Sequence, residues 1–420
     1  MNKRIQKTVA AMVVFGGVAA ACGSDSVDDA IDAVEDAAED AVEDVEEAVE
    51  DVEEAAEDAV EEVEEAVEDA MDEAVCPSNL VIQTDWWPES EHGGTYNMVN
   101  PEGASADASL FTYSGPIKDA YKVGGIETVE VRAGGDAIEF QPVVSVMQTD
   151  RDITLGYVNT DDAFQSSGTV QVTGVATTLE KNPQMLQWDP TQTEIDPDDP
   201  TTIAASGARI LHFPGTTYID WMIAQGYMTE DQSDPNYGGA PDQWISSGGD
   251  FIQQGFVTNE IYKYENDIPW KDDAPADVEF AIIHDLGWQP YPAMYSVLTE
   301  RLDELSPCLE VLVPALQQSW VDYLADPAPV GDQIIAVTEE YNNFWTLSPG
   351  LNEAAFGLFD SEEIATNGGD DTYGNFDPAR VETLFEEIGG VLDARGIEMA
   401  DGMTADSVYT NEFIDESIGR

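Results

Sequence analysis

The sequence predicts an α/β fold of two lobes, preceded by an export signal and an acidic stalk that is helical or disordered. Short apolar runs with strand character alternate with amphipathic helical patterns from residue 78 onward, which is typical of α/β layers. The length of 420 residues suffices for two lobes of ordinary size. Aromatic residues make up 9% of the chain, more than an acidic disordered protein carries, so we expect a folded body.

The first 22 residues are typical of an export signal. Basic residues near the start precede an apolar run from Thr8 to Val18, which is too short to span a bilayer comfortably. Three alanines then precede Cys22, and this arrangement resembles a bacterial lipoprotein signal. We therefore expect Cys22 to be lipidated and to anchor the mature protein at the outer face of the cytoplasmic membrane. The alternative is an ordinary signal cleaved near Ala21, and either signal exports the chain.

Residues 23–75 form an acidic stalk of low complexity. Between Asp25 and Glu73 the stalk contains 26 Asp and Glu residues and neither Lys nor Arg. An 18-residue repeat, Val27–Asp44 and then Val45–Glu62, leaves Ala and Val on one narrow stripe of a straight helix. The repeat lacks the 3.5-residue period of a coiled coil, so we expect a monomer. Because like charges oppose helix formation, a semi-rigid helical stalk and a disordered tether both remain open.

The whole chain carries 86 acidic and 15 basic residues, a net charge of −71. Such a surface repels nucleic acid and anionic membranes, so we expect no nucleic-acid partner. It suits a saline habitat, where screening over about 8 Å or less reduces self-repulsion.

The body begins near Cys76, and a buried strand is expected at Leu80–Thr84. Cys76 and Cys308 either form a disulfide in the exported protein or remain as two buried thiols. Further strands are expected at Thr128–Arg132, Ile153–Val158, Val170–Thr178, Ala208–His212 and Val278–His284. Helices are expected at Tyr218–Gln225, Ser296–Leu305, Leu309–Leu324, Asp332–Tyr341 and Pro378–Val391.

The segment Leu80–Gly94 (LVIQTDWWPESEHGG) resembles the ABC-importer solute-binding proteins for thiamine pyrimidine precursors, sulfonates and nitrate. It is most similar to the pyrimidine-precursor branch, whose first strand ends in Asp-Trp-x-Pro followed by His and Gly. Those residues are here Asp85, Trp86, Pro88, His92 and Gly94. Further resemblances lie at Gly125–Gly135, Gly156–Asp161, Val172–Pro183, Gly255–Tyr262 and Thr404–Ser417.

The resemblance implies a type II periplasmic-binding-protein fold, in which two crossovers join two lobes that close like a hinge. It places lobe one at residues 78–172 plus 275–420 and lobe two at residues 173–274. It also implies a protein that is not an enzyme and that delivers a small-molecule ligand to a membrane permease and its ATPase.

Aromatic faces and a few placed polar groups usually hold a ligand in such a cleft. Trp86 and Trp87 follow the first strand, where an α/β lobe presents its ligand-facing loops. Because adjacent residues point different ways, we expect one Trp in the cleft and one in packing, and the resemblance favours Trp86 for the cleft. His92 could hydrogen-bond a heterocycle or serve a structural role.

Polar residues after later strands are further candidates. Asn159 and Asp161 could contact the ligand, or they could cap the following helix. Thr216 precedes a helix whose backbone N–H groups could hold a polar group, with ordinary capping as the alternative. The loop of the other lobe contributes Asn259, Glu260 and Tyr262. The acid in this set could pair with an amino group or be a generic surface acid.

No catalytic residue, cofactor or metal site is predicted. Three scattered histidines lack zinc-ligand spacing, and neither a serine-hydrolase nor a nucleotide-binding motif is present. The Trp and His pair favours a pyrimidine-like or other heteroaromatic vitamin precursor as ligand. The alternative ligands are a sulfonate, taurine or nitrate, for which Arg132 and Arg209 are nearby candidates. An envelope surface-interaction protein is the alternative of another class.

Overall fold

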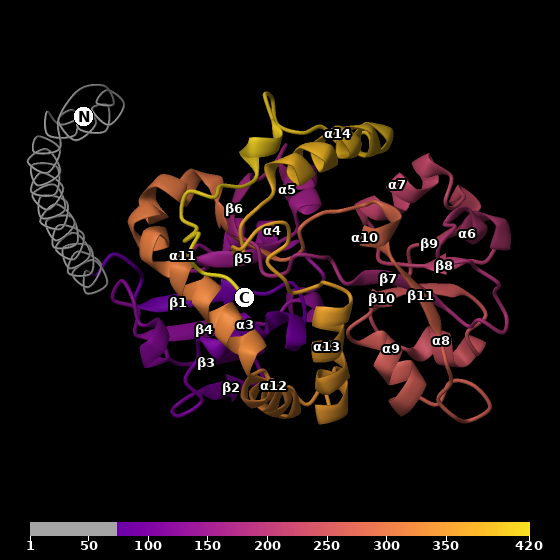
Figure 1. Ribbon diagram of the computed structural model, residues 1–420, viewed down its shortest axis with the longest axis horizontal. Helices are drawn as coiled ribbons and strands as arrows, with labels where there is room; N and C mark the ends of the chain where they lie inside the picture. Colours follow the sequence, from indigo (N-terminus) through magenta and orange to yellow (C-terminus); the bar gives the residue numbers. More distant parts are fainter. Residues whose placement is uncertain (1–73) are drawn as a thin grey trace, which may run out of the picture. The chain divides into compact units, whose positions relative to one another are not determined.

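The computed structural model describes residues 74–420, which contain two β-sheets flanked by helices (Figure 1). Cys22 and nearly all of the acidic stalk lie outside the described residues. The first sheet has seven strands in the order β2-β3-β4-β1-β5-β12-β6, and the second has five in the order β11-β7-β10-β8-β9.

The first sheet has a parallel centre. β1 lies between β4 and β5 and is parallel to both, whereas β2, β3, β6 and β12 pair in antiparallel fashion. Both faces of β1 are covered, because Leu80 and Ile82 enter one apolar core and Val81 enters the other. The strand bounds are β1 Asn79–Gln83, β2 Ser105–Asp107, β3 Thr112–Pro116, β4 Thr128–Arg132, β5 Leu155–Val158, β6 Val172–Ala176 and β12 Met294–Leu298.

In the second sheet, β8, β9 and β10 are parallel, and β7 runs antiparallel to β10 and β11. The strand bounds are β7 Gln184–Trp188, β8 Ile210–Leu211, β9 Ser233–Asp234, β10 Ile252–Phe256 and β11 Glu279–Ile282. The helices of this part are α6 Thr201–Ser206, α7 Thr217–Gln225, α8 Asp242–Ser247 and α9 Glu260–Tyr262. The chain passes between the two sheets twice, from β6 to β7 and from β11 to β12.

Two sequence expectations differ from this arrangement. The second sheet spans residues 184–282 rather than lying within 173–274, because β6 belongs to the first sheet and β11 to the second. The helix predicted at Ser296–Leu305 is wrong over Ser296–Leu298, which belong to the fully buried strand β12, and the helix α11 (Leu302–Ala325) begins only at Leu302. A short apolar run does not distinguish a buried strand from a buried helix by periodicity, and pairing with β5 and β6 decides here.

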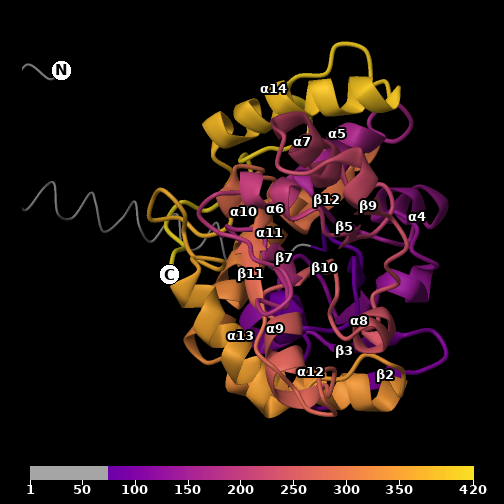
Figure 2. The ribbon, with the colours of Figure 1, turned by 90° about the vertical axis from the view of Figure 1, so that its right-hand side faces the viewer.

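In the described part of the chain, seven further α-helices accompany the first sheet. Their bounds are α3 Gly93–Asn97, α4 Val143–Thr149, α5 Thr160–Ser166, α11 Leu302–Ala325, α12 Ala328–Tyr341, α13 Pro349–Ser361 and α14 Pro378–Arg395. The short helix α10, Ile283–Leu286, follows β11 and contacts the second sheet at β7 and β11. No helix in residues 74–420 is long and apolar enough to cross a membrane. Figure 2 shows α14 lying across α5 and α7, so this helix contacts both parts of the body.

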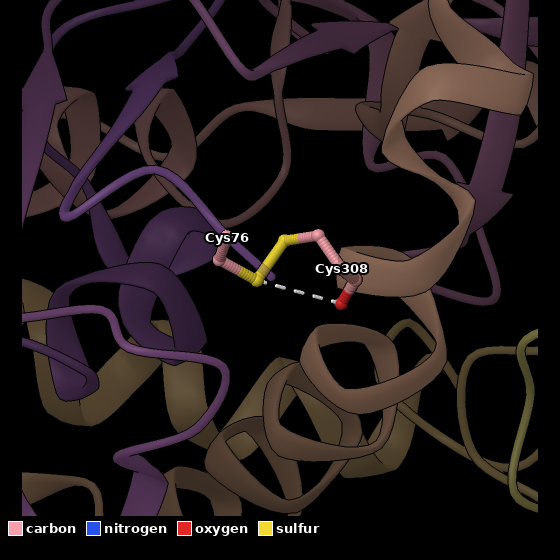
Figure 3. The surroundings of a disulfide bond; sticks show 2 residues. All are labelled: Cys76 and Cys308. Carbon is pink, nitrogen blue, oxygen red and sulfur yellow. Dashed lines mark hydrogen bonds between the residues drawn. A yellow bond between two sulfur atoms is a disulfide. The ribbon is translucent and has the colours of Figure 1, made fainter. Parts of the chain in front are cut away.

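Cys76 and Cys308 form a disulfide that joins the segment before β1 to the beginning of α11 (Figure 3). The two cysteines are 232 positions apart in sequence. The bond therefore closes a loop that contains every strand of both sheets.

The close approach of α3 to α11 requires glycine, and this leads to a stability prediction. A Cβ on Gly94 would lie 2.3 Å from ring atoms of Trp320. We expect Gly94→Ala to lower the free energy of unfolding by about 1–3 kcal/mol, because the ring or the helix must move. Thermal unfolding measures this. Gly390→Ala in α14 is the matched control: its Cβ would have no neighbour within 4 Å, so it should stabilise by about 0.4–1 kcal/mol. Equal melting temperatures for Gly94→Ala and the wild type would contradict the packing argument.

Candidate ligand-binding cleft

Parallel strands of both sheets end at one shared cavity of about 690 Å³. In the first sheet, Asp85 and Trp86 follow β1, Gly135 follows β4, and Asn159 follows β5. In the second sheet, the loops after β8 and β9 contribute the other wall. The carboxyl ends of parallel strands are the usual place for ligands in α/β folds.

Five aromatic residues line this cavity, of which Tyr157 is buried at 1% exposure. We call the other four the aromatic cage: Trp86, Phe140, Phe213 and Tyr237. The ring centroid of Trp86 lies 6.1 Å from that of Phe140 and 5.6 Å from that of Phe213. Tyr237 lies 4.9 Å from Phe213. The cage therefore joins rings from both sheets around one space.

Local backbone geometry holds two members of the cage in place. A Cβ on Gly135 or Gly239 would come within 3 Å of the Trp86 ring, so these glycines make room for the indole. Glu139 and Phe140 both have left-handed φ values, 57° and 55°, although neither is glycine. Phe140 nevertheless remains 49% exposed. Strained backbone and an exposed aromatic ring together are typical of a binding site.

A second cavity of about 140 Å³ adjoins the first and shares Asp85, Trp86, Phe213, Thr216 and Tyr237 with it. Trp345 and Glu89 line this adjoining cavity, as does Glu260. The Trp345 ring makes an edge contact with Trp86 at 5.7 Å between centroids.

Every charged side chain that lines the two cavities in residues 74–420 is a carboxylate: Asp85, Glu89, Asp162 and Glu260. Asp85 Oδ1 lies 3.2 Å from His92 Nε2. Asn159 donates from Nδ2 to Asp162 Oδ2 at 3.0 Å, and the Phe256 backbone N–H donates to Glu260 Oε2 at 2.8 Å.

Burial raises the pKa values of several carboxyl groups around the cleft. The pKa of Asp162 is raised to about 8, chiefly by burial and further by the negative charges of Asp161 and Asp85, while Arg395 opposes the shift. Burial also raises the pKa of Glu89 well above its usual range, reinforced by Glu91. At pH values between the unfolded and folded pKa, Asp162 therefore holds a proton in the folded state that the unfolded chain releases.

The free energy of unfolding is therefore expected to fall as the pH rises from about 4 to about 8. The unfolded carboxyl titrates near pH 3.9, so the stability that protonated Asp162 contributes is fully present below that pH. It is lost as the pH rises through the folded pKa of about 8. Melting temperatures at constant ionic strength test this. Asp162→Asn should flatten the dependence, whereas the exposed control Asp277→Asn should follow the wild type. An unchanged slope in Asp162→Asn would contradict the assignment.

Four of the residues expected at the site line the two cavities. Trp86, Asn159 and Thr216 line the large cavity, and Glu260 lines the adjoining one. Asp161 lines a third cavity of about 70 Å³, which shares Asn159, Asp162 and Thr216 with the large one. There Asp161 accepts a hydrogen bond from Thr217 Oγ1 of α7. Asn159 also holds the crossover to β12, because its Oδ1 accepts from the Ala293 backbone N–H at 2.9 Å.

The other four expected residues do not line these cavities. Trp87 is 1% exposed and packs in the core against Phe111, since it points away from its neighbour Trp86. His92 is buried beneath the site, where it contacts Asp85 rather than the open space. Asn259 is buried at the start of α9, and Tyr262 lies at the end of that short helix. Direct ligand contact by these residues stays a prediction, and the structure places them outside the two cavities.

Sequence reasoning missed most of the cleft's other lining residues. They include Asp85, Glu89, Asp162, Phe140, Phe213, Tyr237 and Trp345. Phe213 could have been found, because it directly follows a predicted strand. Tyr237 follows a strand of only two residues, which leaves no periodic signal.

No protein-family model and no curated protein matches the chain. Solved structures with the same fold include the periplasmic aliphatic sulphonate binding protein SsuA from Escherichia coli, with a TM-score of 0.52 at 9% identity over 81% of this chain and 94% of that chain. They also include the alkanesulfonate-binding protein SsuA from Xanthomonas axonopodis pv. citri bound to MOPS, with a TM-score of 0.51 at 12% identity over 80% of this chain and 99% of that chain. The predicted fold class is thereby confirmed.

Proposed function

We propose that this chain, which has the fold of periplasmic binding proteins, is an extracytoplasmic solute-binding protein that delivers a small organic molecule to a membrane permease and its ATPase. Its ligand carries a flat ring and is either pyrimidine-like or another heteroaromatic vitamin precursor. A lipid on Cys22 anchors the protein to the outer face of the cytoplasmic membrane. The observation that carries the proposal is the aromatic cage at the shared edge of two sheets.

The size and chemistry of the cleft support a small organic ligand. Its volume of about 690 Å³ lies within the range of about 300–1,000 Å³ that small-molecule pockets occupy. Aromatic walls bury a ring over a large area and favour offset or edge-on contacts with it. Trp86 offers such a wall from the first sheet and Phe213 offers one from the second, so one ring can engage both lobes.

Contacts between the lobes support capture by hinge closure. Arg395, at the end of α14, donates to Asp220 Oδ2 of α7 at 2.5 Å and to the Thr216 backbone carbonyl at 2.7 Å. It also donates to Gln165 Oε1 of α5 at 2.6 Å. One guanidinium thus joins elements of both parts of the body, at the edge of the cleft.

A sulfonate, taurine or nitrate ligand finds less support in the cleft. Arg132 pairs with Glu130 and Asp150, and Arg209 pairs with Asp234. Neither arginine lines the described cavities. Backbone N–H groups at the start of α7 could attract an anion, but Asp162 and Asp85 face the same space.

A thermal-shift screen of the purified protein in high salt tests the proposal, with heteroaromatic compounds, sulfonates and nitrate in one library. A ligand present at 100 times its dissociation constant stabilises the folded state by about 2.7 kcal/mol. Heteroaromatic hits confirmed by calorimetry would support the proposal. Hits with sulfonates or nitrate would replace the ligand class and keep the transport role. A well-folded protein that binds nothing in the library would contradict solute binding and favour an envelope surface-interaction protein.

A further inference from the structure

The ligand-binding cleft combines aromatic faces with carboxylates and, among the described residues that line it, includes neither Lys nor Arg. We propose that the cleft selects organic cations, holding a positively charged nitrogen against the aromatic cage and facing Asp85 and Asp162. This inference rests on the proposed function and names the ligand class of the same site.

The aromatic cage is suited to a cation. The negative face of an aromatic ring attracts a cation within about 6 Å of the ring centroid, most strongly when water is excluded. The cage offers several faces around one space, because Phe213 lies within 6 Å of Trp86, Phe140 and Tyr237 by ring centroids. The structure already contains one such contact beside the cleft, where Lys263 Nζ lies 4.0 Å from the Trp345 ring.

Two carboxylates from different elements of the first lobe line the large cavity with the cage. Asp85 follows β1, and Asp162 lies in the first turn of α5. The neighbouring positive side chains are engaged elsewhere, since Arg395 binds Asp220 and Lys263 lies over Trp345. A cationic ligand would supply a counter-charge to both groups and would favour the ionised form of Asp162, which burial keeps protonated below a pKa of about 8.

Glu89 provides an independent indication of a missing cation. Its carboxylate is 2% exposed and lines the adjoining cavity, yet no described donor hydrogen-bonds to it. Among residues 74–420, the basic side-chain nitrogen within 4 Å of it is His92 Nε2, at 3.5 Å from Oε1. Burial raises the pKa of Glu89 because an uncompensated carboxylate is costly there, and a nearby cation would favour its ionised form. A cation in the cleft would lie near this group as well as near Asp85.

The charge of the ligand can be tested with three probes that share one ring. Nicotinate is an anion, nicotinamide is neutral, and 1-methylnicotinamide is a permanent cation. Calorimetric titration of each probe therefore measures how the affinity depends on the charge of the ligand. We expect 1-methylnicotinamide to bind the full protein at least about tenfold more tightly than nicotinamide, with nicotinate weakest. Equal affinities for the cation and the neutral ring, or tightest binding of nicotinate, would overturn the inference.

Variants of single residues test whether the cleft carboxylates cause the preference for a cation. Asp162→Asn and Asp85→Asn should each reduce the ratio of 1-methylnicotinamide affinity to nicotinamide affinity at least about fivefold, and the exposed control Asp277→Asn should leave this ratio unchanged. A preference that persists in both cleft variants would overturn the assignment of these residues.

The library screen distinguishes failure of the charge assignment from failure of the proposed function. Binders that are all neutral or anionic overturn the charge assignment alone, whereas a library without any binder overturns the solute-binding role itself.

Discussion

Cys308→Ser is expected to lower the free energy of unfolding by about 2–5 kcal/mol. The disulfide to Cys76 spans 232 positions, and a bond that closes a longer loop removes more conformational entropy from the unfolded chain. It also fixes the segment before β1 against α11, whose Cys308 is fully buried. Urea unfolding of the variant and of the wild type measures the difference.

Reductant and the partner variant control this experiment. Cys76→Ser should show the same loss as Cys308→Ser, and the double variant should show no further loss, because all three lack the same bond. Reductant should destabilise the wild type alone. Wild-type stability that is indifferent to reductant, with the bond shown by mass spectrometry to be broken, would contradict the expected contribution.

The parts of this molecule that the sequence predicts well are those governed by local pattern. The apolar run at Leu80 predicts β1, and a strand end in an α/β lobe predicts that Trp86 faces the cleft, as the structure places it. The same reasoning expects Trp86 and Trp87 to diverge, because adjacent side chains leave an extended backbone in opposite directions.

The parts that the sequence does not predict depend on tertiary assembly. Phe140 lines the cleft because Glu139 and Phe140 itself adopt left-handed φ values, which the sequence does not predict, since neither residue is glycine. Trp345 comes from the loop between α12 and α13. β12 has no periodicity that separates it from a helix, so its place between β5 and β6 depends on distant partners. Residue pattern alone also gives no measure of the carboxylate excess inside the cleft, since acids are frequent everywhere in this chain.

Trp86→Ala is expected to weaken binding of a cleft ligand by about 30- to 1,000-fold, which corresponds to a loss of about 2–4 kcal/mol for a central aromatic contact. Trp86 contacts cage rings from both sheets and borders both cavities, so its removal opens the wall that a ring would face. Because Trp86 is only partly buried, the melting temperature of the unliganded protein should change little.

Its neighbour provides the matched control. Trp87 is 1% exposed and packs against Phe111 and Tyr341 in the core, so Trp87→Ala should cost about 3–5 kcal/mol of stability. The Trp87→Ala molecules that remain folded should bind ligand almost normally, because this side chain lies outside both cavities. Calorimetric titration and thermal unfolding of the two variants thus give opposite expected patterns. Retained affinity in Trp86→Ala, or lost affinity in folded Trp87→Ala, would contradict a binding site at the aromatic cage. The comparison is direct because the two variants remove the same side chain from adjacent positions, and only the Trp86 side chain lines the cavities.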